Sequence, residues 1–141
     1  MPPGMLCENR QESSCVGFKA RDKYHSPMYA TYLDPELHAA VTGAPATVGV
    51  EPGSLFLAVG GQISGTMLSV IAPRLIVQSW RSTNFLDADP DSILILAFVP
   101  DGKHGRIDLI QIDVPEQDYQ GVSVGWEKYY WAPWKRYLAQ E

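Results

Sequence analysis

The sequence lacks several features that would each indicate a class of protein. It has no run of lysine or arginine, and its formal net charge at pH 7 is −5. Because nucleic-acid affinity depends largely on clustered cations that displace counterions, we expect neither nucleic acid nor an anionic membrane as a partner. No apolar run approaches the roughly 20 residues that span a bilayer, and the first residues lack the charged start and apolar stretch of a signal peptide. These absences predict a cytoplasmic protein without membrane insertion.

Cysteine and clustered histidine are also scarce. The two cysteines, Cys7 and Cys15, lie in a polar N-terminal segment, so a disulfide between them would connect nothing to a core. In a cytoplasmic chain we expect two reduced thiols. His25, His38 and His104 lie far apart and do not form the spacing of a zinc site. The sequence therefore predicts no metal and no cofactor.

The chain as a whole has the size and composition of one globular domain. It contains 141 residues, of which 45% are apolar, enough for a hydrophobic core. Residues 1–17 show little apolar periodicity and are expected to form a flexible tail. Residues 18–141 are expected to form a single domain.

Two segments that contain proline predict a pair of short helices. Ser26 and Asp34 can each act as an N-cap, and a proline follows each of them at the first helical position, where its missing N–H costs nothing. We therefore expect helices over Pro27–Leu33 and Pro35–Thr42. Gly43 is well placed to end the second helix.

From Thr47 onward, short apolar segments alternate with glycine, proline and aspartate, a pattern typical of an antiparallel meander. Within these segments apolar and polar residues alternate, so one face of the sheet can be buried while the other is wetted. A weaker strand signal lies before the helices, between Gly17 and His25. The expected strands of the meander are Leu55–Val59, Gln62–Ile71, Arg74–Ser82, Ser92–Val99 and Arg106–Val114.

The C-terminal stretch GWEKYYWAPWKRYL is unusually rich in aromatic residues. Five large residues recur in it at the spacing of one helix face. Burial of each contributes about 1.5 to 3 kcal/mol, which outweighs the roughly 3 kcal/mol that Pro133 costs inside a helix. We expect a long C-terminal helix that covers the sheet and is kinked near Tyr129 to Pro133. The stripe consists of Trp126, Tyr130, Trp134, Tyr137 and Leu138.

The segment GVSVG, from Gly121 to Gly125, matches the nucleophile elbow of serine hydrolases. In such enzymes the catalytic histidine follows the serine along the chain, whereas all three histidines here precede Ser123. We therefore interpret GVSVG as a helix-entry loop in which Ser123 can cap the C-terminal helix.

Two further motifs resemble binding loops but lack essential residues. GGQISGTM, which starts at Gly60, has the glycine spacing of a phosphate-binding loop without its lysine, so we expect a hairpin. Asp87, Asp89 and Asp91 resemble a calcium loop, but Phe98 stands where a bidentate glutamate is required, so we expect a solvated acidic turn. The sequence offers no nucleophile–base pair or metal cluster, and we expect a protein that is not an enzyme. Chemistry inside a cavity, with polar groups from Tyr29, Trp80, Arg81 and Tyr130, is the third hypothesis.

The order of these elements, a strand, two short helices, a run of antiparallel strands and one long helix, is that of the helix-grip (START-like, Bet v 1-like) fold. The blocks MYATYLDPELHAAVTGAPATV, EPGSLFLAVGGQISGTMLSVIAPRLIVQSWR, PDSILILAFVPDG and GWEKYYWAPWKRYL resemble the C-terminal-type domain of the family of the activator of heat shock protein 90 ATPase. The resemblance runs from about Phe18 to Leu138. It implies an α+β fold in which a curved antiparallel sheet packs against two short helices and one long C-terminal helix.

The same resemblance implies a non-catalytic module, similar to a co-chaperone, that binds a heat shock protein 90 type chaperone and modulates its ATPase. The alternative is that a small apolar ligand binds in a cavity between the sheet and the C-terminal helix, as in related helix-grip proteins. Residues at the rim, or in contact with a partner, are expected to be Tyr129, Trp131 and Arg81. The residues expected to line a cavity are Tyr29, Phe56, Trp80, Leu96, Trp126, Tyr130 and Trp134.

Overall fold

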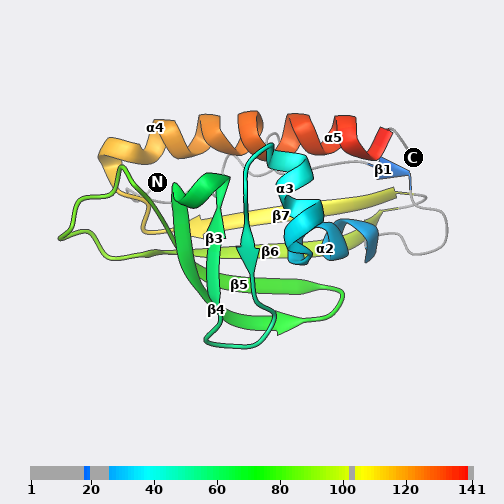
Figure 1. Cartoon of the computed structure of the whole chain (residues 1–141), viewed down its shortest axis with the longest axis horizontal. Coiled ribbons are helices and arrows are strands. Elements are labelled where there is room, and N and C mark those ends of the chain that lie inside the picture. The colour runs from blue at the N-terminus through cyan, green and yellow to red at the C-terminus, as the bar shows by residue number, and fades with distance from the viewer. Residues whose placement is uncertain (1–17, 20–25, 102–103, 140–141) are drawn as a thin grey trace.

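The computed structural model describes residues 18–19, 26–101 and 104–139, and a single antiparallel sheet forms one layer of the molecule (Figure 1). The strand order is β1-β7-β6-β5-β4-β3-β2, so the six strands after β1 form a meander and β1 joins its far edge. With its helices, this sheet confirms the expected α+β helix-grip architecture. The strands are β1 (Phe18–Lys19), β2 (Thr47–Val48), β3 (Leu55–Ala58), β4 (Ile63–Ile71), β5 (Leu75–Ser82), β6 (Ser92–Asp101) and β7 (His104–Ile112).

The longer strands begin and end within two residues of the expected bounds. The hairpin expected at GGQISGTM is confirmed, because β3 pairs with β4 across the short 3₁₀ segment η2 (Val59–Gly61). Gly60 and Gly61 adopt φ angles of 65° and 90° in this turn. Such left-handed angles carry little steric cost for glycine, which has no Cβ.

The two short helices α2 (Ser26–Leu33) and α3 (Pro35–Thr42) are present where the sequence predicts them. The Asp34 carboxylate caps α3 by accepting hydrogen bonds from the backbone N–H groups of Glu36 and Leu37, at 2.9 and 3.2 Å. Gly43 ends α3 with a φ of 81°, and its N–H donates to the Ala39 carbonyl. Local capping chemistry therefore sets both ends of this helix.

The C-terminal helix runs along the whole sheet as α4 (Glu116–Gly125), the π-helical segment η3 (Trp126–Trp131) and α5 (Ala132–Ala139) (Figure 1). The interpretation of GVSVG as a helix-entry loop was wrong, because Ser123 lies inside α4 and the helix already begins at Glu116. Acidic residues in the first turn favour that earlier start through the helix dipole. The two glycines of GVSVG are poor helix formers, so the residues of this segment did not indicate a helix.

The change of backbone expected near Tyr129 to Pro133 takes the form of a π-helical turn. The N–H of Ala132 donates to the carbonyl of Glu127, five residues earlier. Proline has no N–H, and inside an α-helix its ring clashes with the carbonyl four residues earlier. A wider turn immediately before Pro133 provides room for this ring.

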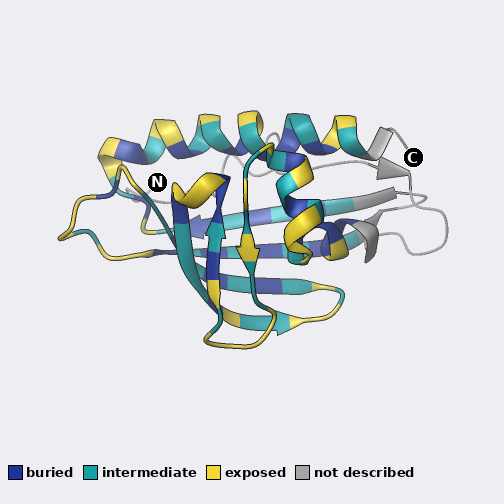
Figure 2. Cartoon of the chain, in the orientation of Figure 1, coloured by how far each residue is buried: buried dark blue, intermediate teal, exposed yellow. Residues whose placement is uncertain are grey.

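The core lies between the sheet and its helices. Along the strands, buried residues alternate with half-buried or exposed residues (Figure 2). Since successive side chains of a strand point to opposite faces, the inner face of the sheet is buried and the outer face is not. The helix α3 contacts both η3 and α5, so the short and long helices form one layer. Fully buried side chains of the sheet include Phe56, Met67, Ile76, Leu94, Leu96 and Ile107.

Some expectations concern residues outside the described ranges. These are the flexible tail with Cys7 and Cys15, and most of the weak strand before His25. Among the helices that the structure describes, none combines the length and the hydropathy needed to cross a membrane.

Candidate functional site

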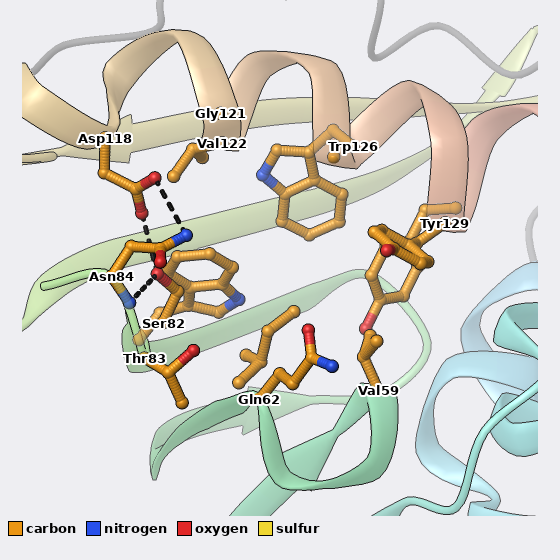
Figure 3. Close-up of a pocket in the computed structure, with 14 residues that line it drawn as sticks. Val59, Gln62, Ser82, Thr83, Asn84, Asp118, Gly121, Val122, Trp126 and Tyr129 are labelled. Carbon is orange, nitrogen blue, oxygen red and sulfur yellow. Dashed lines mark hydrogen bonds between the residues drawn. The ribbon is translucent and has the colours of Figure 1, made fainter.

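A pocket of about 100 Å³ lies between one end of the sheet and the first half of the C-terminal helix (Figure 3). The turn that joins β3 to β4, the end of β5 with the two residues after it, and α4 with η3 form its walls. It opens to solvent between exposed side chains such as Gln62, Thr83 and Asn84. The residues that line it are Val59, Gln62, Ile63, Trp80, Ser82, Thr83, Asn84, Asp118, Gly121, Val122, Gly125, Trp126, Tyr129 and Tyr130.

One end of the pocket is formed by the carboxylate of Asp118, which is only 4% exposed. The hydroxyl of Ser82 donates to its Oδ2 at 2.7 Å, and the amide of Asn84 donates to its Oδ1 at 3.5 Å (Figure 3). Neither of the ion pairs found among the described residues involves Asp118. A nearly buried carboxylate is therefore held by neutral donors alone.

The other end of the pocket is aromatic. The rings of Trp80 and Trp126 lie 6.3 Å apart between centroids, and Trp126 contacts Tyr130 at 4.6 Å. Trp126 is oriented by its indole N–H, which donates to Gln111 Oε1 at 2.9 Å. In turn, Gln111 Nε2 donates to the hydroxyl of Ser92. A buried hydrogen-bond network from the sheet thus fixes the Trp126 ring of the wall.

Behind this wall, Tyr130 connects the C-terminal helix to α3. His38 Nδ1 lies 2.7 Å from the Tyr32 carbonyl, which can only accept, so Nδ1 carries the proton and Nε2 accepts from the Tyr130 hydroxyl at 2.8 Å. Burial lowers the pKa of His38 and raises the pKa of Tyr130 well above its usual range. Both groups are therefore neutral at physiological pH, and the contact is structural.

The structure brings together only some of the residues expected at a cavity. Trp80, Trp126 and Tyr130 line the pocket, and Tyr129 lines it too. The other residues expected to line a cavity are absent from its lining and are buried in the core instead. These residues are Tyr29, Phe56, Leu96 and Trp134.

Trp131 is not at a rim, contrary to expectation, because it is only 1% exposed. The π-helical turn takes more residues per turn than an α-helix, so Trp126 and Trp131, five residues apart, both face the core and stack at 5.2 Å. An α-helical wheel places these residues on different faces, which is why the sequence pattern misplaced Trp131.

Arg81 does not line the pocket; it anchors the loop between β5 and β6. Its guanidinium pairs with Asp91 at 2.7 Å and donates to the carbonyls of Leu86 and Asp89. The carboxylate of Asp89 accepts from the Leu86 N–H and from Gln117. The acidic turn is thus held together by protein donors, and in the described part of the chain no group of three or more His, Cys, Asp or Glu could hold a metal ion.

Sequence reasoning missed the polar end of the pocket. Asp118 precedes Val122 and Trp126 at spacings of four, so the helical stripe, extended toward the N-terminus, would have placed it on the inner face. No sequence signal brings Ser82 and Asn84 to Asp118, because these residues come from a strand end and a loop more than 30 residues away.

The sequence profile of the family described as Activator of Hsp90 ATPase homolog 1-like protein matches residues 26–139. This match covers most of the chain, from α2 to the end of α5. The chain belongs to this family. The Activator of Hsp90 ATPase homolog 1-like fold therefore accounts for the arrangement of sheet, short helices and long helix.

Curated relatives in the family are activators of the 90 kDa heat shock protein ATPase. The human homolog 1 is 29% identical over 105 residues, which span 73% of this chain and 30% of the human protein. A Dictyostelium discoideum homolog is 27% identical over 106 residues, which span 73% of this chain and 27% of that protein. The chain thus spans about a third of the length of the curated relatives it matches.

Solved structures of low sequence identity share the fold. An HSP90 activator from Plasmodium falciparum superposes with a TM-score of 0.73 at 17% identity, over 82% of this chain and 89% of that chain. CalU16 from Micromonospora echinospora superposes with a TM-score of 0.68 at 23% identity, over 84% of this chain and 71% of that chain. The fold therefore occurs both in an HSP90 activator and in CalU16, a protein that is not named as one.

Proposed function

We propose that this chain is a non-catalytic module that binds a heat shock protein 90 type chaperone and modulates its ATPase. The observation that carries this proposal is the match of 105 residues to the human activator at 29% identity. The likeness to the Plasmodium falciparum activator supports it, because that likeness covers 89% of the activator chain that was solved.

The outer face of the sheet is the surface we propose for the chaperone contact. Val77 pairs with Ile95, and Ile95 pairs with Ile110, so these apolar side chains form a row across three strands. Leu68, which is 46% exposed, lies at the irregularity in β4, directly before Ser69, which pairs with Val77. We call these four residues the outer-face row. An apolar row on a solvent-facing sheet is typical of an interaction surface.

The proposal is tested by isothermal titration of the protein with the heat shock protein 90 chaperone of its own source organism, together with the chaperone's ATPase assay. We expect saturable binding and a change in ATPase rate. The double variant Leu68→Ser/Ile95→Thr should bind roughly tenfold more weakly or worse, because it removes apolar contact area from the row. Threonine retains the β-branched shape that suits a strand.

Val124→Thr provides the matched control, because Val124 is 53% exposed but lies on α4, away from the outer-face row. Its affinity for the chaperone should equal that of the unmodified protein. Absence of binding at high micromolar chaperone concentration would overturn the proposed function. An equal loss of affinity in both variants would overturn the proposed surface.

A further inference from the structure

The pocket beside α4 combines a charge, a shape and a lining that together select one class of ligand. Asp118 is the one formally charged side chain among its lining residues, and no lysine, arginine or histidine lines it. We propose that this pocket binds a primary alkylammonium group, with Asp118 as its hydrogen-bond acceptor. This inference is independent of the proposed chaperone function.

Asp118 retains free acceptor capacity. An ionised carboxylate can accept about four hydrogen bonds, whereas Asp118 receives one at 2.7 Å from Ser82 and a long one at 3.5 Å from Asn84. Oδ1 is therefore only weakly engaged on the side of Asn84. Since a nearly buried charge is costly unless it is paired, a cationic ligand stabilises this carboxylate more than a neutral ligand can.

Gly121 provides the space that Asp118 occupies. A Cβ atom at Gly121 would lie 2.7 Å from Asp118 Oδ1, closer than such atoms approach. Glycine is a poorer helix former than alanine. Its presence one turn after Asp118 in α4 leaves room for the carboxylate beside the pocket.

The aromatic end suits the alkyl chain and the positive charge of the same ligand. Trp126 and Tyr129 present ring surface to the pocket (Figure 3), and ring faces attract cations as well as apolar groups. Tyr129 already contacts an ammonium on the protein itself, because Lys128 Nζ lies 5.2 Å from its ring centroid. The lining is therefore compatible with an ammonium group on a short apolar stem.

The volume limits the size of this ligand. About 100 Å³ is roughly two thirds of the volume of an engineered cavity of about 150 Å³ that binds benzene. This space therefore fits a ligand smaller than benzene, such as propylammonium or the end of a lysine side chain.

The test uses the whole chain and heteronuclear NMR titrations at low ionic strength with propylammonium chloride, Nα-acetyl-lysine amide, 1-propanol and tetramethylammonium chloride. We expect the two primary ammonium compounds to shift the signals of Trp126 and Tyr129 saturably. Propanol lacks the charge and tetramethylammonium lacks N–H donors, so both should bind more weakly. Stronger binding of acetyl-lysine amide would assign the site to a lysine side chain, and stronger binding of propylammonium to a free amine; both support the proposal.

Two variants test the role of Asp118. Asp118→Asn removes the charge and retains the size, and should weaken propylammonium binding roughly tenfold or more. Gly121→Ala retains Asp118 but displaces Oδ1, and should weaken binding in the same direction. Glu116→Gln is the control, because it removes an exposed carboxylate from the same helical turn, and its affinity should not change.

Several outcomes would overturn the inference. These are no binding of either primary ammonium at millimolar concentration, equal binding of propanol or tetramethylammonium, and unchanged affinity in Asp118→Asn while the variant keeps a dispersed NMR spectrum. If Asp118→Asn fails to fold, unchanged affinity for propylammonium in Gly121→Ala would overturn the inference instead.

Discussion

At the scale of single residues, the interior contains hydrogen-bonded polar side chains that connect separate elements. His38 on α3 contacts Tyr130 on η3, and Tyr32 on α2 donates to Gln78 on β5 at 3.0 Å. Because loss of a partner for a buried polar group is costly, these contacts help to specify how the short helices lie against the sheet and the long helix. The charge state of His38 is consequently tied to the fold.

His38 gives the stability of the protein a defined pH dependence. Burial lowers its folded-state pKa below the unfolded value of about 6.5. The unfolded chain therefore binds more protons as pH falls below that value, and stability that is fully present above it is lost at lower pH. We expect the free energy of unfolding, measured by urea titration, to decrease from pH 7.5 to pH 5.5 in the unmodified protein.

His38→Gln is the control for this prediction. The variant should be less stable at pH 7.5, because it disturbs the contacts with Tyr32 and Tyr130. It should also show a smaller decrease of stability between the two pH values, since the buried imidazole is gone. An equal pH dependence in both proteins would contradict the prediction.

At the scale of elements, the π-helical segment η3 determines which aromatic residues reach the core. Trp126, Tyr130, Trp131 and Trp134 are all buried, although an α-helix cannot direct all four to one narrow face. The one extra residue in the π turn rotates α5 relative to α4 and brings both halves of the helix onto the sheet. The exposed Lys128 lies within this turn.

Deletion of Lys128 should convert η3 into a regular α-helix. The deletion removes the extra residue of the π turn, so Trp126, Tyr130, Trp131 and Trp134 come to lie at positions i, i+3, i+4 and i+7, which share one face of an α-helix. We therefore expect all four side chains to stay buried, and the free energy of unfolding to fall by much less than the roughly 3 kcal/mol that the loss of a large core side chain costs. Chemical denaturation followed by far-UV circular dichroism measures this change.

Lys128→Ala separates the effect of length from the effect of the side chain. It retains the π turn and removes only the exposed contact with the Tyr129 ring, so its stability should change by less than about 1 kcal/mol. A loss of roughly 3 kcal/mol or more in the deletion, with little change in the substitution, would contradict the interpretation of the π turn as a one-residue insertion.

At the scale of the whole molecule, one chain of aromatic contacts crosses from the sheet to the end of the long helix. Trp80 on β5 contacts Trp126 at 6.3 Å, Trp126 contacts Trp131 at 5.2 Å, and Trp131 contacts Trp134 at 6.2 Å. All four tryptophans of the protein take part in this series of aromatic contacts. Their near-UV signal therefore reports on the packing of helix against sheet.

The sheet and the helices should consequently unfold together. We expect the thermal transitions measured by near-UV circular dichroism, which follows the tryptophans, and by far-UV circular dichroism, which follows the backbone, to coincide. A near-UV transition at clearly lower temperature would indicate that the long helix separates from an intact sheet.

The sequence by itself determined the elements whose causes are local. Asp34 and Gly43 set the ends of α3 through capping, and Gly60 with Gly61 set the hairpin between β3 and β4, because these effects act over a few residues. The stripe of Trp126, Tyr130 and Trp134 predicted a helix that covers a sheet, and the ordered sequence blocks identified the family.

Only the tertiary structure decided the site. Asp118, Ser82 and Asn84 meet because α4 crosses the end of β5, and no spacing along the chain encodes that crossing. The burial of Trp131 likewise depended on a π turn that the helical period of 3.6 residues does not contain. Tyr29, Phe56, Leu96 and Trp134 were expected around a cavity, but packing filled the centre of the molecule with them. The open space remained at one end of the molecule, between the turn after β3, the end of β5 and the first half of the long helix.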